Sequence, residues 1–340
     1  SGKSVTERLF SFFARANYSY QDKYMLSASI RHEGSSKFAA DNRWANFWSA
    51  TAGWRISNEE FMKDFDWLDD LKIRFGYGVT GNNDFSATYM ANMLGSDTNW
   101  MMPNGTWAYS YGKSQNVNPN LGWEEKKEWN LGVDYSFFEG RLYGKFDYYR
   151  REVDNLLFSV KVPQPPYTQG SQMQNIGSME SKGWEFEVGG DIIRTKDFTW
   201  SSSMNLSHNT GKILTLEGDN SYHNGNGFVA PGTPGDAARM EAGSTIGSFY
   251  MWKFAGFDDE GSFLLYNKDG EVIPAAQKTE NDKQYIGNYT PKLIIGWSHT
   301  LTYKNFDLGI NLRSWIDFDV FNTINMYYGL SEVAGQNVLR

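Results

Sequence analysis

The side chains best suited to binding a ligand lie in the stretch from Gly81 to Glu124. This stretch opens with three small polar residues and continues with four large aromatic ones: Asn82, Asn83, Asp84, Trp100, Trp107, Tyr109 and Tyr111. Aromatic rings on a polar loop offer apolar platforms, while amide and carboxylate groups offer hydrogen-bond donors and acceptors. This mixture suits the CH face and hydroxyls of a sugar, or a peptide. The alternative is that the rings pack together and only hold the loop in shape.

No residues are spaced as a catalytic or metal-binding motif. The four histidines (His32, His208, His223 and His299) do not form a metal pair, and the sequence contains no phosphate loop, nucleophile elbow or triad. Residues 258–261 read Asp-Asp-Glu-Gly, but they lack the alternating Asp positions and distant Glu of a calcium loop, which favours a solvated turn. Cysteine is absent, which excludes disulfides and Cys-based sites. We therefore expect no enzyme, no metal and no cofactor.

The elements that position these residues show a strict alternation of apolar and polar side chains. Residues 129–137 read Trp-Asn-Leu-Gly-Val-Asp-Tyr-Ser-Phe, with every second residue large and apolar. Because a β-strand sends alternate side chains to opposite faces, one face is apolar and the other is small, polar or charged. The pattern recurs about ten times, which is typical of the strands of a transmembrane β-barrel.

Composition agrees with such an all-β membrane protein. Aromatic residues make up 16% of the 340 residues, whereas the mean hydropathy is -0.57. No run of about 18 apolar residues exists, as a membrane-spanning helix would need. The net charge of -8 argues against a nucleic-acid partner. The termini carry no initiator Met and no signal peptide, so we expect a segment of a longer protein.

The predicted connections are sorted by length. Those at one end are short, except for Asn58 to Asp70, and those at the other end are long: Gly34 to Asn46, Gly81 to Glu124, Ser159 to Lys182 and Gly211 to Thr290. Outer-membrane barrels have short periplasmic turns and long extracellular loops, whereas a soluble sandwich has no reason to sort its loops.

Three local predictions follow from shorter patterns. Ser57 with Glu60 resembles a capping box, and Phe61, Phe65 and Leu68 follow at helical spacing, which predicts a small helix packed under the rim. Residues 267–270, Asn-Lys-Asp-Gly between apolar runs, predict a hairpin. Polar-face charges such as Lys145 and Asp147 are expected to compensate one another. Outward rings are expected to form an interfacial girdle: Trp54, Tyr77, Trp184, Trp297 and Tyr303.

Several longer motifs resemble the SusC/RagA-type TonB-dependent transporters of Bacteroidetes. They are Val-Asn-Pro-Asn-Leu-Gly-Trp-Glu (117–124), Lys-Lys-Glu-Trp-Asn-Leu-Gly (126–132), Asn-Ile-Gly-Ser-Met-Glu (175–180) with Lys-Gly-Trp-Glu (182–185), Ile-Gly-Ser-Phe-Tyr (246–250) with Lys-Phe-Ala-Gly (253–256), Tyr-Ile-Gly-Asn-Tyr-Thr-Pro-Lys (285–292) and Asp-Phe-Asp-Val-Phe-Asn (317–322). These motifs are spread over most of the chain.

The resemblance implies a segment of a 22-stranded antiparallel transmembrane β-barrel in the outer membrane. On this interpretation residues 1–340 are part of the barrel domain, with the plug, the TonB box and the closing strands outside this chain. The implied function is import of oligosaccharides or peptides, driven through TonB, with a SusD-like surface lipoprotein as lid. The implied assembly is a dimer of transporter–lipoprotein pairs surrounded by outer-membrane lipid. The loops Gly81 to Glu124 and Gly211 to Thr290 are expected to touch substrate or lid. A passive porin and a soluble all-β glycan-binding protein are the alternatives.

Overall fold

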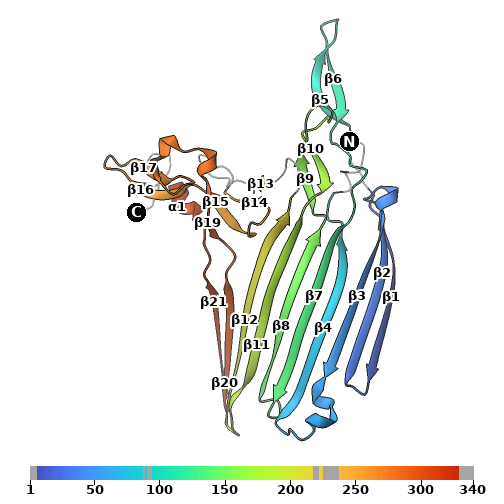
Figure 1. Cartoon of the computed structure of the whole chain (residues 1–340), viewed down its shortest axis with the longest axis vertical. Coiled ribbons are helices and arrows are strands. Elements are labelled where there is room, and N and C mark those ends of the chain that lie inside the picture. The colour runs from blue at the N-terminus through green and yellow to red at the C-terminus, as the bar shows by residue number, and fades with distance from the viewer. Residues whose placement is uncertain (1–5, 87–88, 90–93, 217–221, 225–236, 329–340) are drawn as a thin grey trace.

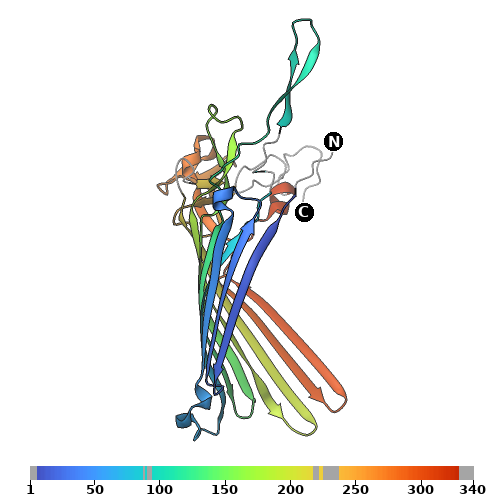
Figure 2. The same cartoon turned by 90° about the vertical axis from the view of Figure 1, so that its right-hand side faces the viewer.

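The body of the molecule is one ten-stranded antiparallel sheet (Figure 1). The computed structural model describes residues 6–86, 89, 94–216, 222–224 and 237–328. The strands follow one another in chain order: β1 (Leu9–Tyr20), β2 (Tyr24–Ser35), β3 (Trp44–Arg55), β4 (Leu68–Asn82), β7 (Glu124–Phe137), β8 (Leu142–Asp154), β11 (Ser178–Arg194), β12 (Phe198–Thr215), β20 (Leu293–Tyr303) and β21 (Phe306–Ile316). The predicted all-β class and the number of strands are confirmed. Figure 2 shows the first and last strands inclined differently, because the sheet twists.

The register confirms the predicted faces. Leu71 pairs with Tyr135, Ile73 with Val133 and Phe75 with Leu131, so the apolar side chains of neighbouring strands share a face. That face is exposed along the sheet, with Leu26 at 53%, Phe75 at 48% and Leu131 at 43% of their surface accessible. An apolar surface of this extent marks contact with lipid or another apolar partner.

Aromatic side chains form two rows on this apolar face. The upper row follows the register across five strands: Trp48, Tyr77, Trp129, Tyr148 and Trp184. A lower row near the turns includes Trp54 and Tyr303. From Trp129 to Phe137, the last residue of β7, the strand is about 26 Å long. At a tilt of about 40° this corresponds to a height of about 20 Å, somewhat less than the ~25 Å apolar band of outer-membrane barrels. The remaining girdle residue, Trp297, lies between the rows, midway along β20.

At three places a tyrosine is directly paired with a glycine on the neighbouring strand. The directly paired residues are Tyr135 with Gly144, Tyr143 with Gly189 and Tyr149 with Gly183. A Cβ atom at Gly183 would lie 2.7 Å from the Tyr149 hydroxyl and 2.3 Å from the backbone oxygen of His208. Glycine therefore makes room for both the ring and the neighbouring strand.

The connections are sorted by end, as predicted (Figure 1). The lower end carries short turns at 21–23, 138–141, 195–197 and 304–305, together with the longer segment 56–67. The upper end carries 36–43, 83–123, 155–177 and 216–292. The third of these was predicted at Ser159 to Lys182. It starts earlier because Asn155, with φ of 56°, ends β8, and it finishes earlier because β11 pairs from Ser178 onwards.

The predicted helix after Ser57 is wrong. The segment forms two separate 3-10 turns, η2 (Ile56–Asn58) and η3 (Glu60–Met62), with Glu59 extended between them at ψ of 150°. The Ser57 hydroxyl donates to Asp70 (3.0 Å) instead of forming a capping box. Phe61 and Phe65 are 62% and 42% exposed rather than packed under the rim. Side-chain contacts of Glu59, described below, hold the extended conformation that interrupts a helix.

The upper connections carry small sheets of their own. The pairs are β5 (Leu94–Met101) with β6 (Trp107–Lys113), β9 (Leu157–Lys161) with β10 (Ser171–Asn175), β13 (Tyr222–Asn224) with β14 (Arg239–Glu241), and β15 (Ser248–Met251) with β19 (Gln284–Asn288). A three-stranded ribbon comprises β16 (Lys253–Phe257), β17 (Phe263–Tyr266) and β18 (Val272–Pro274). Its β17–β18 hairpin confirms the prediction at 267–270.

Within the described residues, helical structure is limited to short segments. Besides η2 and η3, these include η1 (Ala40–Asn42), η6 (Ala275–Gln277), η7 (Glu280–Asp282) and α1 (Thr323–Tyr328). Across the described ranges, no helix has the length and apolar character needed to cross a membrane.

Candidate functional site

An aromatic cluster at the upper rim holds the long connections against the sheet. Its buried members come from two connections, 36–43 and 83–123, and from β3: Phe38, Phe47, Phe85, Leu121 and Trp123. The Trp123 ring lies 4.9 Å from Phe38 and 5.3 Å from Phe47, and its indole N–H donates to the backbone oxygen of Arg43 (3.1 Å). A Cβ atom at Gly81 would lie 2.0 Å from the Phe47 ring, so glycine is required beside this cluster.

Asparagine side chains join the connection 83–123 to the connection 155–177. Asn118 donates to the backbone oxygen of Met173 (3.0 Å), and Asn116 donates to that of Gln169 (2.7 Å). Asn175 accepts from the backbone N–H of Gly122 (2.7 Å) and donates to the Gly122 oxygen (3.0 Å). Sequence reasoning did not assign these roles, although Asn118 and Asn175 belong to the motifs quoted above.

The predicted polar residues lie where β4 ends. The Asn82 amide donates to Glu124 (2.9 Å), and its oxygen accepts from the backbone N–H of Asp84 (2.9 Å). The backbone oxygen of Asn83 accepts from the Lys37 ammonium (3.2 Å). These contacts hold the end of β4 to the start of β7 and to the connection 36–43.

The predicted aromatic residues lie elsewhere, on the β5–β6 hairpin that projects beyond the rim (Figures 1 and 2). Trp100, Trp107 and Tyr109 are 66%, 67% and 72% exposed. Trp107 and Tyr109 are two residues apart in β6 and share one face, whereas Trp100 pairs with Ala108 and lies on the other. Tyr111 lies further along β6, and its side chain is outside the described residues. The hairpin therefore presents rings on both faces and does not gather them around Asn82.

A second exposed aromatic surface, which sequence reasoning missed, lies on the β16–β18 ribbon. Phe254, Phe257 and Phe263 have ring centroids 5.0–6.0 Å apart. Their exposed fractions are 52%, 59% and 49%. The Lys-Phe-Ala-Gly motif contains Phe254, but only the pairing of β16 with β17 brings the three rings together.

The polar face of the sheet is lined by paired charges, as expected. Arg74 makes two hydrogen bonds to Asp134 (2.7 and 2.9 Å) and also reaches Asp147 (3.2 Å). Lys145 pairs with Glu187 at 3.1 Å, and Asp147, which was predicted as its partner, is bonded to Arg74. In the part of the chain that the structure describes, no group of three or more His, Asp or Glu side chains could hold a metal ion.

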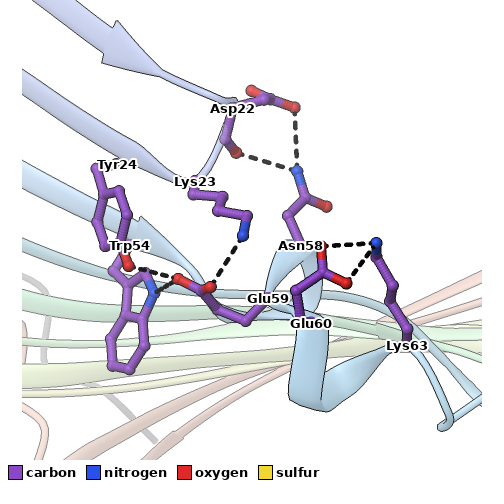
Figure 3. Close-up of polar contacts among 8 residues, drawn as sticks. All are labelled: Asp22, Lys23, Tyr24, Trp54, Asn58, Glu59, Glu60 and Lys63. Carbon is purple, nitrogen blue, oxygen red and sulfur yellow. Dashed lines mark hydrogen bonds and ion pairs between the residues drawn. The ribbon is translucent and has the colours of Figure 1, made fainter.

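A carboxylate at the lower end collects three donors (Figure 3). Glu59 accepts from the Tyr24 hydroxyl (2.6 Å), the Trp54 indole N–H (3.0 Å) and the Lys23 ammonium (3.0 Å). These bonds, that from Tyr24 first, lower the pKa of Glu59 to about 2. Beside it, Asn58 donates to Asp22, and Lys63 pairs with Glu60 at 2.8 Å.

The lowered pKa of Glu59 predicts a pH-dependent contribution to stability. A carboxyl with a lower pKa in the folded state stabilises the fold above its unfolded pKa of 4.5, and this contribution is lost as the pH falls from there to about 2. The urea midpoint of the complete protein should therefore exceed that of Glu59→Gln at pH 7, and the difference should shrink below pH 4.5. A difference that is constant down to pH 2.5 would contradict this interpretation.

The fold and its surfaces define the class of protein: an outer-membrane β-barrel wall with one apolar face, short turns at one end and long connections at the other. Residues 1–322 match the family model described as TonB dependent receptor-like, beta-barrel. The chain belongs to this family, whose members are outer-membrane transport proteins and not enzymes.

Individual relatives agree with the family. The chain is 34% identical over 325 residues to the TonB-dependent receptor SusC of Bacteroides thetaiotaomicron, covering 92% of this chain and 32% of that protein. It is 33% identical over 339 residues to a TonB-dependent receptor of Formosa agariphila, again covering 92% and 32%. Among solved structures, the RagAB peptide importer in its open-open state aligns with a TM-score of 0.78 at 27% identity, covering 92% of this chain and 33% of that one. The chain thus spans about a third of the length of these relatives.

Proposed function

We propose that this chain forms part of the wall of a TonB-dependent transporter that imports oligosaccharides or peptides with a SusD-like lipoprotein lid. The names of two relatives support this proposal: SusC is a TonB-dependent receptor, and RagAB is a peptide importer. The observation that carries it is the exposed aromatic hairpin β5–β6, which lies at the end of the wall that carries the long connections.

The free edges of the sheet support a larger barrel. Within the described residues, β1 and β21 each pair on one side only. Unpaired backbone groups cost several kcal/mol each in lipid, so both edges need further strands. Residues 1–340 would then supply part of one barrel domain of 22 strands, whose wide lumen requires a plug. The charges around Arg74 would face that lumen.

The two aromatic surfaces suit two different partners. Rings on both faces of β5–β6 can stack on a sugar ring or pack on a peptide side chain at the entrance. Asn82, Asn83 and Asp84 would support this entrance from the strand end. The Phe254, Phe257 and Phe263 surface is exposed and apolar, which suits a protein partner such as the lid. A dimer of transporter–lipoprotein pairs would place one lid on each barrel.

Removing the hairpin rings tests this function. In the complete transporter, Trp100→Ala, Trp107→Ala and Tyr109→Ala combined should lower the apparent affinity for imported oligosaccharide or peptide at least ~tenfold, since losing about 1.4 kcal/mol of contact already has that effect. Uptake of a labelled oligosaccharide and peptide library measures this. The barrel should keep its folded gel mobility, because all three side chains are exposed.

A matched variant separates the two surfaces. Phe257→Ala should weaken capture of the lipoprotein while leaving substrate binding by the isolated transporter unchanged. Unaltered uptake in the triple variant would refute the role of the hairpin, and uptake that persists without TonB would support a passive porin instead.

A further inference from the structure

Segment 56–67 at the lower end lies on the apolar side of the wall. Tyr24 and Trp54 belong to the apolar faces of β2 and β3, and both donate to Glu59 (Figure 3). At the other end of the segment, Trp67 stacks on Phe137, the last apolar-face residue of β7, with centroids 5.6 Å apart. Bonds from Ser57 to Asp70 and from Asn58 to Asp22 hold the segment to the strand ends. Both aromatic attachments are to the lipid-facing side, so the segment folds outward from the barrel and not into its lumen.

This segment exposes large aromatic side chains close together. Phe61 is 62% exposed, Phe65 42% and Trp67 48%, and Phe65 meets Trp67 edge to face at 6.0 Å. Phe138 in the adjacent turn is 54% exposed. Exposed rings at this density are unfavourable in water and favourable at the boundary between lipid headgroups and acyl chains.

We propose that residues 56–67 form an interfacial anchor that inserts Phe61, Phe65 and Trp67 into the inner leaflet of the outer membrane. The occupant is lipid because the segment continues the lipid-facing surface directly below its lower aromatic row. Its charges favour zwitterionic phospholipid over anionic lipid, since it carries one lysine and four carboxylates: Glu59, Glu60, Asp64 and Asp66. Glu59 is the clamp that holds the anchor against the wall.

The absence of cysteine from this chain allows a direct measurement of depth. The complete transporter, with any cysteine outside this chain replaced and a nitroxide at Phe61→Cys as its single label, is placed in bilayers of phosphatidylethanolamine and phosphatidylcholine. The measured quantity is the ratio of the label's collision rate with oxygen to its collision rate with a water-soluble nickel reagent. This ratio should be severalfold higher than for the control Lys196→Cys, which lies in an exposed turn at the same end. Equal values at both positions would overturn the proposal. Shielding of Phe61→Cys from both reagents would indicate a protein partner and would also overturn it.

The clamp is tested separately. In a Glu59→Gln background the label at Phe61→Cys should move towards water, while a label at Leu131→Cys on the apolar face of β7 should still report lipid. A label at Phe61→Cys that keeps its lipid exposure would overturn the assignment of Glu59. Neither measurement depends on transport, so failure of the proposed function leaves this result interpretable.

Discussion

Replacing Gly183 by valine should destabilise the barrel by about 3 kcal/mol or more, because overpacking a closely packed site forces the backbone apart. Even the first added atom would lie 2.3 Å from the backbone oxygen of His208 and 2.7 Å from the Tyr149 hydroxyl. The strands on both sides of Gly183 would have to move. The fraction of complete transporter that runs as the folded species on a heat-modifiability gel, across a urea series, measures this loss.

Gly76→Val is the matched control for this substitution. Gly76 lies in β4, between two neighbouring strands, and a Cβ atom there would meet only the methyl group of Thr51, at an ordinary contact distance of 3.4 Å. The control should fold like the unmodified protein. If Gly183→Val folded equally well, the close approach of β8, β11 and β12 at this position would be wrong.

Replacing Trp123 by alanine should cost about 3–5 kcal/mol and release the upper connections, because it empties the centre of the rim cluster. Trp123 is 8% exposed, packs on Phe38 and Phe47, and donates to the backbone oxygen of Arg43. Limited proteolysis should cut within 36–43 and 83–123 at lower protease concentration, and the urea midpoint should fall.

Trp107→Ala serves as the control within the same connection. Trp107 is 67% exposed and lies on the projecting hairpin, so its loss removes little packing. Equal protease resistance in Trp123→Ala and Trp107→Ala would show that the cluster does not hold these connections.

The hairpin at 267–270 and the failed helix at 56–67 show when a local sequence pattern is enough to predict the local structure. Asp269-Gly270 forms the predicted turn because its signal is contained in residues that touch one another, with Gly270 at φ of 82°. The helix prediction used equally local signals. It failed because Glu59 bonds to Tyr24 and Trp54, residues that no local pattern relates to it.

In the candidate site, too, the local sequence predicted some properties and the pairing of strands decided others. That Trp100, Trp107 and Tyr109 lie on an exposed loop follows from the composition of that loop, and their exposure is confirmed. Their separation onto two faces depends on the register of β5 with β6. The Phe254, Phe257 and Phe263 surface depends likewise on pairing across β16 and β17.

By itself, the sequence determined the strands, their two faces and the sorting of connections by end. These properties have a period of two residues or lie in single turns, and lipid on one side enforces the alternation. Only the tertiary structure decided which side chains meet: Trp123 with Phe38, Tyr149 with Gly183 and Glu59 with Tyr24. Each of these contacts joins residues that are distant along the chain or lie on different strands, and their geometry is set by register and twist, which no short stretch of sequence encodes.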